Sequence, residues 1–261
     1  AIGSQALYTE TTGGHNTAVG VNALYHNSGR SGITAVGSAC FFTSTNLTNS
    51  TGIGYQAGYS VTGGDEITVV GYQAGYSITT SSNHTCIGYY AGVNLSTGSN
   101  NTFVGSRAGD ITSTGSNNIC IGYESDPSSN SADGQCTLGN SSISNLRCND
   151  TSISSLSDRR DKTDIVDLPI GLDFVNTLQP RKFKWETRDG NIKDGSVRAG
   201  FIAQELQEAQ SDCNYMQLVL EDNPEKLEAN EGHLIPVLVN AIKELSTKND
   251  ALEARIKTLE G

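Results

Sequence analysis

Apolar and polar positions in the first part of the chain recur with a fixed spacing of 17 residues. A threonine, a variable residue and a branched aliphatic residue stand before a glycine, as in Thr17, Ala18, Val19 and Gly20. This alternation is typical of a β-strand with the threonine and the aliphatic residue on one face. The glycines of the pattern are Gly3, Gly20, Gly37, Gly54, Gly71, Gly88, Gly105, Gly122 and Gly139. The pattern therefore predicts one short strand in each repeat.

The residues around each glycine indicate how the repeats fold. A glycine permits a turn or a close backbone approach, and a small residue such as Ala23 or Ala57 follows three positions later. One unit cannot bury its apolar side alone, so we expect a parallel β-solenoid over residues 1–156. Each coil supplies few aliphatic side chains, which favours association of several chains. A monomeric solenoid is the alternative, whereas the invariant spacing argues against a disordered tract.

The apolar spacing changes near the C-terminus. From Pro236 onward it alternates between steps of four and three residues, which predicts a coiled-coil helix over residues 236–260. The predicted seam consists of Leu238, Ile242, Leu245, Asn249, Leu252, Ile256 and Leu259. A polar residue on the seam, here Asn249, favours correct register at a cost in stability. An amphipathic surface helix is the alternative interpretation.

The segment between the repeats and this helix predicts a small α+β fold over residues 163–232. A helix is expected at 201–210, and His233 is expected to be structural. The predicted core residues of this segment are Phe174, Leu178, Phe183 and Trp185.

Charge separates the two parts of the chain. Residues 1–156 hold eight acidic and three basic groups, and residues 157–261 hold 20 and 14, for a net charge of −11. We therefore expect two domains, 1–156 and 157–261. An acidic chain without a basic block is not expected to bind nucleic acid, and no apolar stretch is long enough to insert into a membrane. The six cysteines form no CxxC pair, so no metal site is predicted. Most of the cysteines are interpreted as buried free thiols. No cofactor is predicted either.

Tyrosines gather after the repeat glycines and have two interpretations. They either stack as a ladder that stabilises the rod or form a stripe that binds sugar rings. These residues are Tyr55, Tyr59, Tyr72, Tyr76, Tyr89, Tyr90 and Tyr123. Cys86 and Cys120 share one repeat position and should share a face.

The carboxylates of the repeats give no sign of a glycan hydrolase. Asp65, Glu66, Asp126 and Asp133 stand as isolated acids in predicted turns. A glycosidase requires two carboxylates that converge on one bond. The sequence predicts no such pair within one chain.

The boundary itself carries candidate catalytic residues. Ser157 precedes Lys162 by five positions, and a serine hydroxyl becomes a nucleophile when a neighbouring base takes its proton. A lysine acts as that base when desolvation or nearby cations lower its pKa. Arg159 and Arg160 would support this effect, whereas Asp158 and Asp161 would oppose it. A solvated linker is the alternative interpretation.

Two resemblances add to these predictions. The repeats, such as residues 16–20 (NTAVG) and 101–105 (NTFVG), resemble the head repeats of trimeric autotransporter adhesins and related viral fibre shafts. Residues 157–165 (SDRRDKTDI), with the later motifs at 200–206 (GFIAQEL) and 234–245, resemble the intramolecular chaperone peptidase domain of phage tail spikes and fibres. The same domain type occurs in membrane-bound transcription factors, but nothing before Ser157 resembles a DNA-binding domain.

The resemblance implies self-cleavage between Leu156 and Ser157, with Ser157 as nucleophile and Lys162 as general base. It implies a homotrimer, a trimeric coiled coil, and a rod in the tail fibre of a virion that binds a host cell-surface receptor or glycan. The chaperone domain would be released in the host cytoplasm during assembly. Asp161 departs from the family pattern before the lysine and puts the efficiency of cleavage in question. The alternatives are an adhesin shaft with an uncleaved chaperone cap and part of a glycan-degrading tail spike.

Overall fold

The computed structural model describes residues 1–149, 154–184, 186 and 195–260. The chain divides into two compact units, Ala1–Ser144 and Asn145–Gly261, which are considered separately below. Within the described residues, no helix is both long and apolar enough to cross a membrane.

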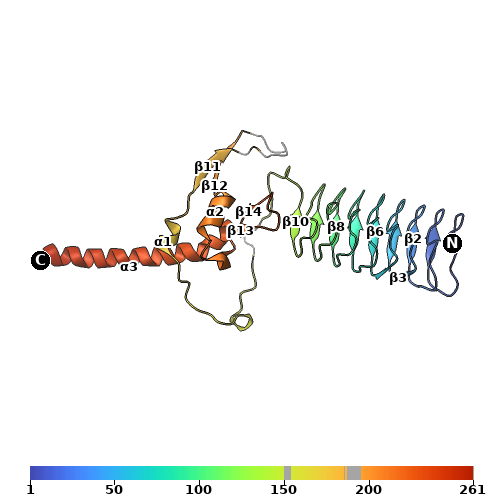
Figure 1. Ribbon diagram of the computed structural model, residues 1–261, viewed down its shortest axis with the longest axis horizontal. Helices are drawn as coiled ribbons and strands as arrows, with labels where there is room; N and C mark the ends of the chain where they lie inside the picture. Colours follow the sequence, from blue (N-terminus) through green and yellow to red (C-terminus); the bar gives the residue numbers. More distant parts are fainter. Residues whose placement is uncertain (150–153, 185, 187–194, 261) are drawn as a thin grey trace. The chain divides into compact units, whose positions relative to one another are not determined.

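The first unit is a parallel β-solenoid, confirming the predicted stacking of repeats (Figure 1). Its eight-stranded sheet pairs residues 17 positions apart in every rung, for example Thr17 with Thr34 and Val19 with Val36. The strands are β1 (Thr17–Val19), β2 (Thr34–Val36), β4 (Thr51–Ile53), β6 (Thr68–Val70), β7 (Thr85–Ile87), β8 (Thr102–Val104), β9 (Ile119–Ile121) and β10 (Cys136–Leu138). A second parallel pair joins β3 (Asn46–Thr48) to β5 (Gly63–Asp65).

The interior of the solenoid is lined by the middle residue of the strands β1 to β4 and β6 to β9. Ala18, Ala35, Val69, Cys86 and Phe103 are buried, whereas the flanking threonines and branched aliphatic residues are partly or fully exposed. The threonine and the branched aliphatic residue of a strand thus share a face, as predicted. This face is the outer face of the solenoid.

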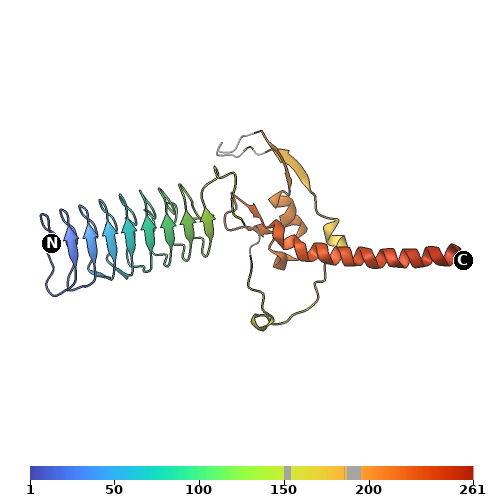
Figure 2. The ribbon, with the colours of Figure 1, turned by 180° about the vertical axis from the view of Figure 1, so that it is seen from behind.

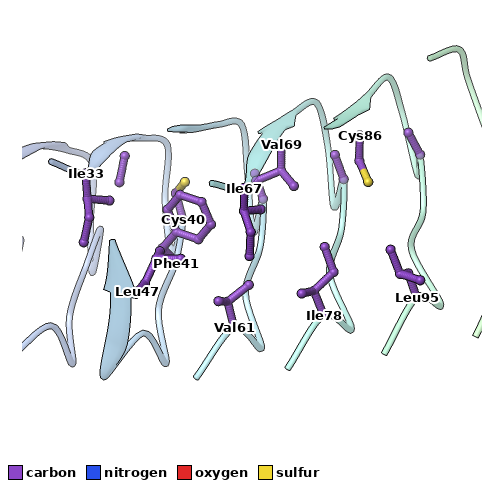
Figure 3. Packing of buried hydrophobic residues seen from close by; sticks show 14 of the residues in the cluster. Ile33, Cys40, Phe41, Leu47, Val61, Ile67, Val69, Ile78, Cys86 and Leu95 are labelled. Atoms are coloured by element: carbon purple, nitrogen blue, oxygen red, sulfur yellow. The ribbon is translucent and has the colours of Figure 1, made fainter. Parts of the chain in front are cut away.

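A continuous core runs through the coils of one chain. Apolar residues from the other sides of the coil, among them Ile33, Leu47, Ile67 and Leu95, complete it (Figure 3). The single chain therefore closes its own coils, and association is not required to bury this core.

The repeat glycines adopt a backbone conformation that side chains disfavour. Gly20, Gly37, Gly54, Gly71 and Gly88 have φ values of 134°, 138°, 135°, 139° and 139°. A Cβ atom on any of them would collide with the carbonyl of the equivalent glycine one coil later. The predicted close backbone approach is thereby confirmed, and the small residues three positions on, such as Ala23 and Ala57, are fully buried.

A column of polar side chains links successive coils inside the solenoid. Asn101 Oδ1 accepts a hydrogen bond from the Asn118 backbone N–H at 2.9 Å, and Asn118 Oδ1 accepts one from Gln135 N–H at 2.9 Å. His84 stands at the same repeat position, and its Nδ1 accepts from Asn101 N–H at 3.4 Å. Because these buried groups are paired, the column contributes to register without leaving polar atoms unsatisfied.

The second unit has short elements around a small core, as the predicted α+β fold requires. Its elements are η1 (Arg159–Asp161), α1 (Leu172–Val175), β11 (Arg181–Lys184), β12 (Val197–Gly200), α2 (Ala203–Ala209), η2 (Asn214–Met216), β13 (Val219–Leu220), β14 (Glu228–Ala229), η3 (Glu231–Leu234) and α3 (Ile235–Glu260). Strands β11 and β12 pair antiparallel, as do β13 and β14. The predicted helix at 201–210 is confirmed as α2.

The core of this unit contains Phe174, Leu206, Met216, Leu218 and Val237. Phe174 is buried and Leu178 packs against the cluster, as predicted; Phe183 is partly buried, and Trp185 lies outside the described residues. His233 Nδ1 lies 2.9 Å from the carbonyl oxygen of Met216, which fits its expected structural role.

Helix α3 is the longest element of the chain, drawn in red in Figures 1 and 2. Val237 and Ala241 are buried against the unit's own core. The amide of Asn240 donates to the carbonyls of Leu168 and Ile170, at 3.1 and 2.8 Å. Glu244 accepts a hydrogen bond from Leu172 N–H at 3.1 Å and so caps α1. Beyond Glu244 every described residue of the helix is exposed.

Candidate functional site

A single turn of 3-10 helix forms the predicted catalytic segment. Asp158 caps the turn η1, because its carboxylate accepts the backbone N–H of Arg160 at 2.8 Å. The turn closes when Lys162 N–H donates to the carbonyl of Arg159 at 3.2 Å. This compact geometry brings the residues on either side of the turn together without help from distant parts of the chain.

Ser157 and Lys162 meet across this turn. Lys162 Nζ donates a hydrogen bond to Ser157 Oγ at 2.5 Å. A lysine that acts as base must instead accept the hydroxyl proton, which requires its neutral amine. The two side chains are within reach for that transfer, and their catalytic roles stay a prediction.

The charges around the pair differ from the expected support. The guanidinium of Arg160 lies 2.6 Å from the carboxylate of Asp158, and the pair lowers the pKa of Asp158. Arg160 is therefore balanced by Asp158 and adds little positive potential at Lys162. Arg159 and Asp161 are exposed members of the same turn.

Solvent reaches the whole segment in the single chain. Leu156, Ser157 and Lys162 are all exposed. The isolated chain thus holds the two side chains in contact without burying them.

The tyrosines form two stacked ladders along the solenoid. Tyr55, Tyr72 and Tyr89 stack with ring centroids 5.3 and 5.5 Å apart, and Tyr90 packs edge-on against this ladder. The second ladder consists of Tyr8, Tyr25, Phe42, Tyr59 and Tyr76. Within each ladder a ring covers the face of its neighbour, so these faces are occupied by ring-to-ring contacts. The structure favours the stabilising interpretation.

The second ladder was missed in part by sequence reasoning. Tyr8, Tyr25 and Phe42 complete a column five residues after the repeat glycines. Aligning the repeats by position, rather than counting tyrosines near glycines, would have revealed it.

The interpretation of Asp126 as an isolated acid is wrong. Asp110, which stands 16 residues earlier, interacts with it across one coil, and burial together with this carboxylate raises the pKa of Asp126 to about 6. Arg107 and Glu124 lie nearby and form an ion pair at 3.9 Å. Asp126 Oδ1 also accepts a hydrogen bond from Ile111 N–H at 3.4 Å. The described residues contain no cluster of three or more histidine, cysteine or acidic side chains able to hold a metal ion.

Four of the cysteines are buried free thiols, as interpreted from the sequence: Cys40, Cys86, Cys120 and Cys213. Burial raises the pKa of Cys40, Cys86 and Cys120 to about 12, so their reactive thiolate forms are disfavoured. Cys86 and Cys120 both face the interior, with Phe103 between them in the stack. Cys136 and Cys148 are exposed.

The predicted seam residues lie on one continuous helix and are exposed. Leu238, Ile242, Leu245, Leu252, Ile256 and Leu259 have exposed side chains, and Asn249 donates to Glu253 Oε1 at 2.9 Å. The first turns of α3 use their opposite face for contacts within the unit. The seam therefore has no partner among the described residues of the chain.

Comparison with known proteins gives one match. The model of a peptidase family described as the chaperone of endosialidase matches residues 157–215. The match begins at Ser157, includes Lys162 and the turn η1, and extends through α2 into η2. Neither the curated proteins nor the solved structures include a match to the chain. Residues 157–215 are thus similar to the chaperone of endosialidase, and they follow a parallel β-solenoid in the same chain.

Proposed function

We propose that the chain is a segment of a viral tail fibre or spike, in which the second domain assembles the β-solenoid and then releases itself. Release is autoproteolysis between Leu156 and Ser157. The contact between Ser157 Oγ and Lys162 Nζ, at the residue where the family match begins, is the observation that carries this proposal. The description of the family as both peptidase and chaperone supports it.

The reaction balances within one chain. Lys162, as neutral amine, takes the hydroxyl proton of Ser157 while Oγ attacks the carbonyl carbon of Leu156. The bond from that carbon to the Ser157 nitrogen breaks, and Lys162 returns the proton to the nitrogen, leaving an ester and a free α-amine. Water then hydrolyses the ester, which yields a carboxylate at Leu156 and restores the serine hydroxyl. The chain acts once, in cis.

Assembly as a homotrimer supplies what the single chain lacks. The outer aliphatic face of the solenoid and the seam of α3 are both exposed, so lateral association would bury apolar area. Burial of the 157–162 segment by neighbouring chains would also desolvate Lys162 and favour its neutral form. Cleavage would therefore follow assembly.

Removal of the second domain after assembly has a physical benefit. Identical repeats can pair one coil out of step with little local cost, so an aligning domain is needed only once. After release, an unfolded rod could no longer refold readily, which makes the assembled rod kinetically stable. The rod would remain in the virion and bind a host cell-surface receptor or glycan, and the chaperone domain would remain in the host cytoplasm.

Intact mass measurement of the purified chain tests this proposal. We expect one fragment ending at Leu156 and one beginning at Ser157, and an uncut chain for Ser157→Ala. Lys162→Arg keeps the charge but cannot readily supply a neutral base, so we expect cleavage to slow by on the order of 10²–10⁴-fold. Lys226→Arg is the matched control and should cleave normally. An uncut parent chain, or cutting of Ser157→Ala at the same bond, would reject autoproteolysis by Ser157.

Two observations favour other functions. Lys162 is exposed and directly follows Asp161, which favours an adhesin shaft that keeps an uncleaved cap. In that case the mass of the intact chain would persist after assembly. Burial and the Asp110 carboxylate raise the pKa of Asp126 to about 6, which is the direction that the general acid of a glycan-degrading spike would require. Digestion of host polysaccharide by the parent chain, lost in Asp126→Asn, would support the latter.

A further inference from the structure

The chain that follows the cleavage segment is held against helix α3 by two polar side chains. The amide of Asn240 donates hydrogen bonds to the carbonyls of Leu168 and Ile170, at 3.1 and 2.8 Å. Glu244, one helical turn later, accepts a hydrogen bond from the Leu172 backbone N–H at 3.1 Å. Together these three hydrogen bonds, here called the clamp, tie the backbone of this stretch to α3.

The clamp lies on a different face of α3 from the seam. Asn240 and Glu244 are four positions apart, on the face that carries the buried residues Val237 and Ala241. Both clamp side chains are half-buried, and a Cβ atom added to Gly171 would collide with the carboxylate of Glu244. The backbone therefore passes close to the helix at this point, and the clamp leaves the seam available to other chains.

The clamp limits how far the cleavage segment can move from α3. Residues 162–170 form no helix or strand, and every residue from 163 to 167 is exposed. Six residue steps separate Lys162 from Leu168, so their Cα atoms can lie at most about 20 Å apart. The first buried core residue after Lys162 is Phe174, at 12 steps, which is twice that length of chain.

We propose that Asn240 and Glu244 are positioning residues for the self-cleavage, because they keep the 157–162 segment within reach of the neighbouring chains. The inference rests on the proposed function, in which those chains bury the segment and favour the neutral form of Lys162. It adds two residues of α3 that lie outside the family match at 157–215.

The length of the tether between Lys162 and the clamp determines the size of the effect. A short tether raises the local concentration of the segment at the surface that buries it, and a longer one dilutes it roughly as the −3/2 power of its length. Doubling the tether should thus reduce burial of the segment about threefold. Leu168 and Ile170 also pack against the core with partly buried side chains, so loss of the clamp alone should have a smaller effect than doubling the tether.

Insertion tests the length of the tether without changing α3. Six glycine and serine residues are inserted between Val166 and Asp167, both of which are exposed, so that the tether grows from six steps to 12. We expect the same number of chains as in the parent by sedimentation, and cleavage about threefold slower by mass spectrometry after synthesis. Cleavage of the inserted chain at the parent rate would overturn the inference.

Removal of the clamp tests the two residues themselves. Asn240→Ala with Glu244→Ala deletes all three hydrogen bonds and puts a strong helix former at both positions, so α3 keeps its helix propensity. We expect normal assembly and cleavage about twofold to threefold slower. The matched control is Thr247→Ala with Asp250→Ala, which removes the same charge from exposed positions of α3 away from the seam and should leave the rate unchanged.

A conservative variant separates positioning from a general need for the carboxylate. Glu244→Gln keeps a side-chain oxygen that can accept the Leu172 N–H, so it should cleave at the parent rate. Cleavage slowed equally in Glu244→Gln and Glu244→Ala would reject the clamp. If the double alanine variant does not assemble, the inserted chain decides the outcome, since its α3 is unchanged.

Digestion by trypsin tests the position of the segment without self-cleavage. Assembled chains that carry Ser157→Ala are digested, and cutting after Arg159 and Arg160 is followed by mass. Chains that also lack the clamp should be cut about twofold to threefold faster, because their segment is buried less often. Equal cutting with and without the clamp would overturn this inference, even for a parent chain that cleaves itself. Faster cutting without the clamp, in a protein whose parent chain stays uncut, would support this inference and reject only the proposed autoproteolysis.

Discussion

Charge next to Lys162 governs how readily it can act as a base. Asp158 balances Arg160 through a contact of 2.6 Å, which leaves Asp161 as the charged residue directly before the lysine. A nearby carboxylate favours the protonated form of a lysine and so opposes its role as a base. The Asp161 side chain is exposed, which leaves room for a substitution without repacking.

Asp161→Asn should therefore speed cleavage. Each unit by which the lysine pKa falls increases its neutral fraction about tenfold near neutral pH, so we expect an increase of several-fold up to about tenfold. The rate is measured by mass spectrometry after synthesis in a cell-free system. Asp164→Asn makes the same charge change outside the 157–162 segment, at a position whose φ of 51° asparagine tolerates. Equal rates for both variants would show that proximity to Lys162 is irrelevant.

His84 makes the rod sensitive to acid. Its ring is buried, Nε2 lies 2.9 Å from Ser81 Oγ, and burial lowers its pKa from 6.5 to about 4. The unfolded chain thus binds a proton between pH 6.5 and 4 that the folded rod does not. The contribution of neutral His84 to the stability of the rod is fully present above pH 6.5. It is lost as the pH falls towards 4, by on the order of 3 kcal/mol.

His84→Asn should remove this pH dependence. Asn101 and Asn118 occupy the same repeat position and accept the equivalent hydrogen bond from the next coil. The measurement is the change in the free energy of unfolding between pH 7 and pH 4.5, compared between the parent and the variant. The parent must be compared with the variant because Asp126, whose pKa is raised, adds stability as the pH falls in both proteins. A parent and variant that lose stability equally would contradict the role of His84.

At the scale of elements, the period of the repeats was predictable and the inward face was not. A 17-residue spacing of glycine and aliphatic residues specifies stacked strands, because equivalent residues must pair. The branched residues suggested a buried face, yet the interior belongs to the variable middle residue, from Ala18 to Phe103. The side chains there differ in size without a regular order, so the interior shows no fixed residue type that a repeat alignment could detect.

The turns of the solenoid should tolerate substitution unequally. Gly71→Ala places a Cβ atom against the carbonyl of Gly88 at a φ of 139°, so we expect a loss of at least on the order of 1–3 kcal/mol, or failure to fold. Gly63→Ala is the matched control: the nearest atom to its Cβ would be 3.7 Å away, and its φ is not positive. Thermal unfolding followed by circular dichroism distinguishes them, and equal stabilities would contradict the close approach.

Local contacts in the candidate site were also more predictable than distant ones. Ser157 and Lys162 are five residues apart, and a single turn capped by Asp158 brings them together. Asp110 and Asp126 interact only because one coil lies above another, at a spacing of 16 rather than 17 residues. That small departure from the repeat concealed the pair.

At the scale of the whole molecule, assembly and cleavage should occur in a fixed order. Leu245→Glu with Leu252→Glu places charges on the seam of α3, so we expect chains that fail to assemble and remain uncut although Ser157 and Lys162 are unchanged. Lys243→Glu with Lys257→Glu changes the helix charge away from the seam and serves as the control. Sedimentation gives the number of chains, expected to be three, and mass spectrometry gives cleavage in the same sample. Efficient cutting in a monomer would contradict the order.

The uniform pairing of the solenoid also has a consequence for inheritance. Because every rung of the eight-stranded sheet joins residues 17 positions apart, a gene that gains or loses one whole repeat preserves the type of every remaining contact. Recombination between misaligned repeats produces such changes in a single step. The length of the rod can thus change in increments of about 4.8 Å, while the charged domain that follows it stays the same.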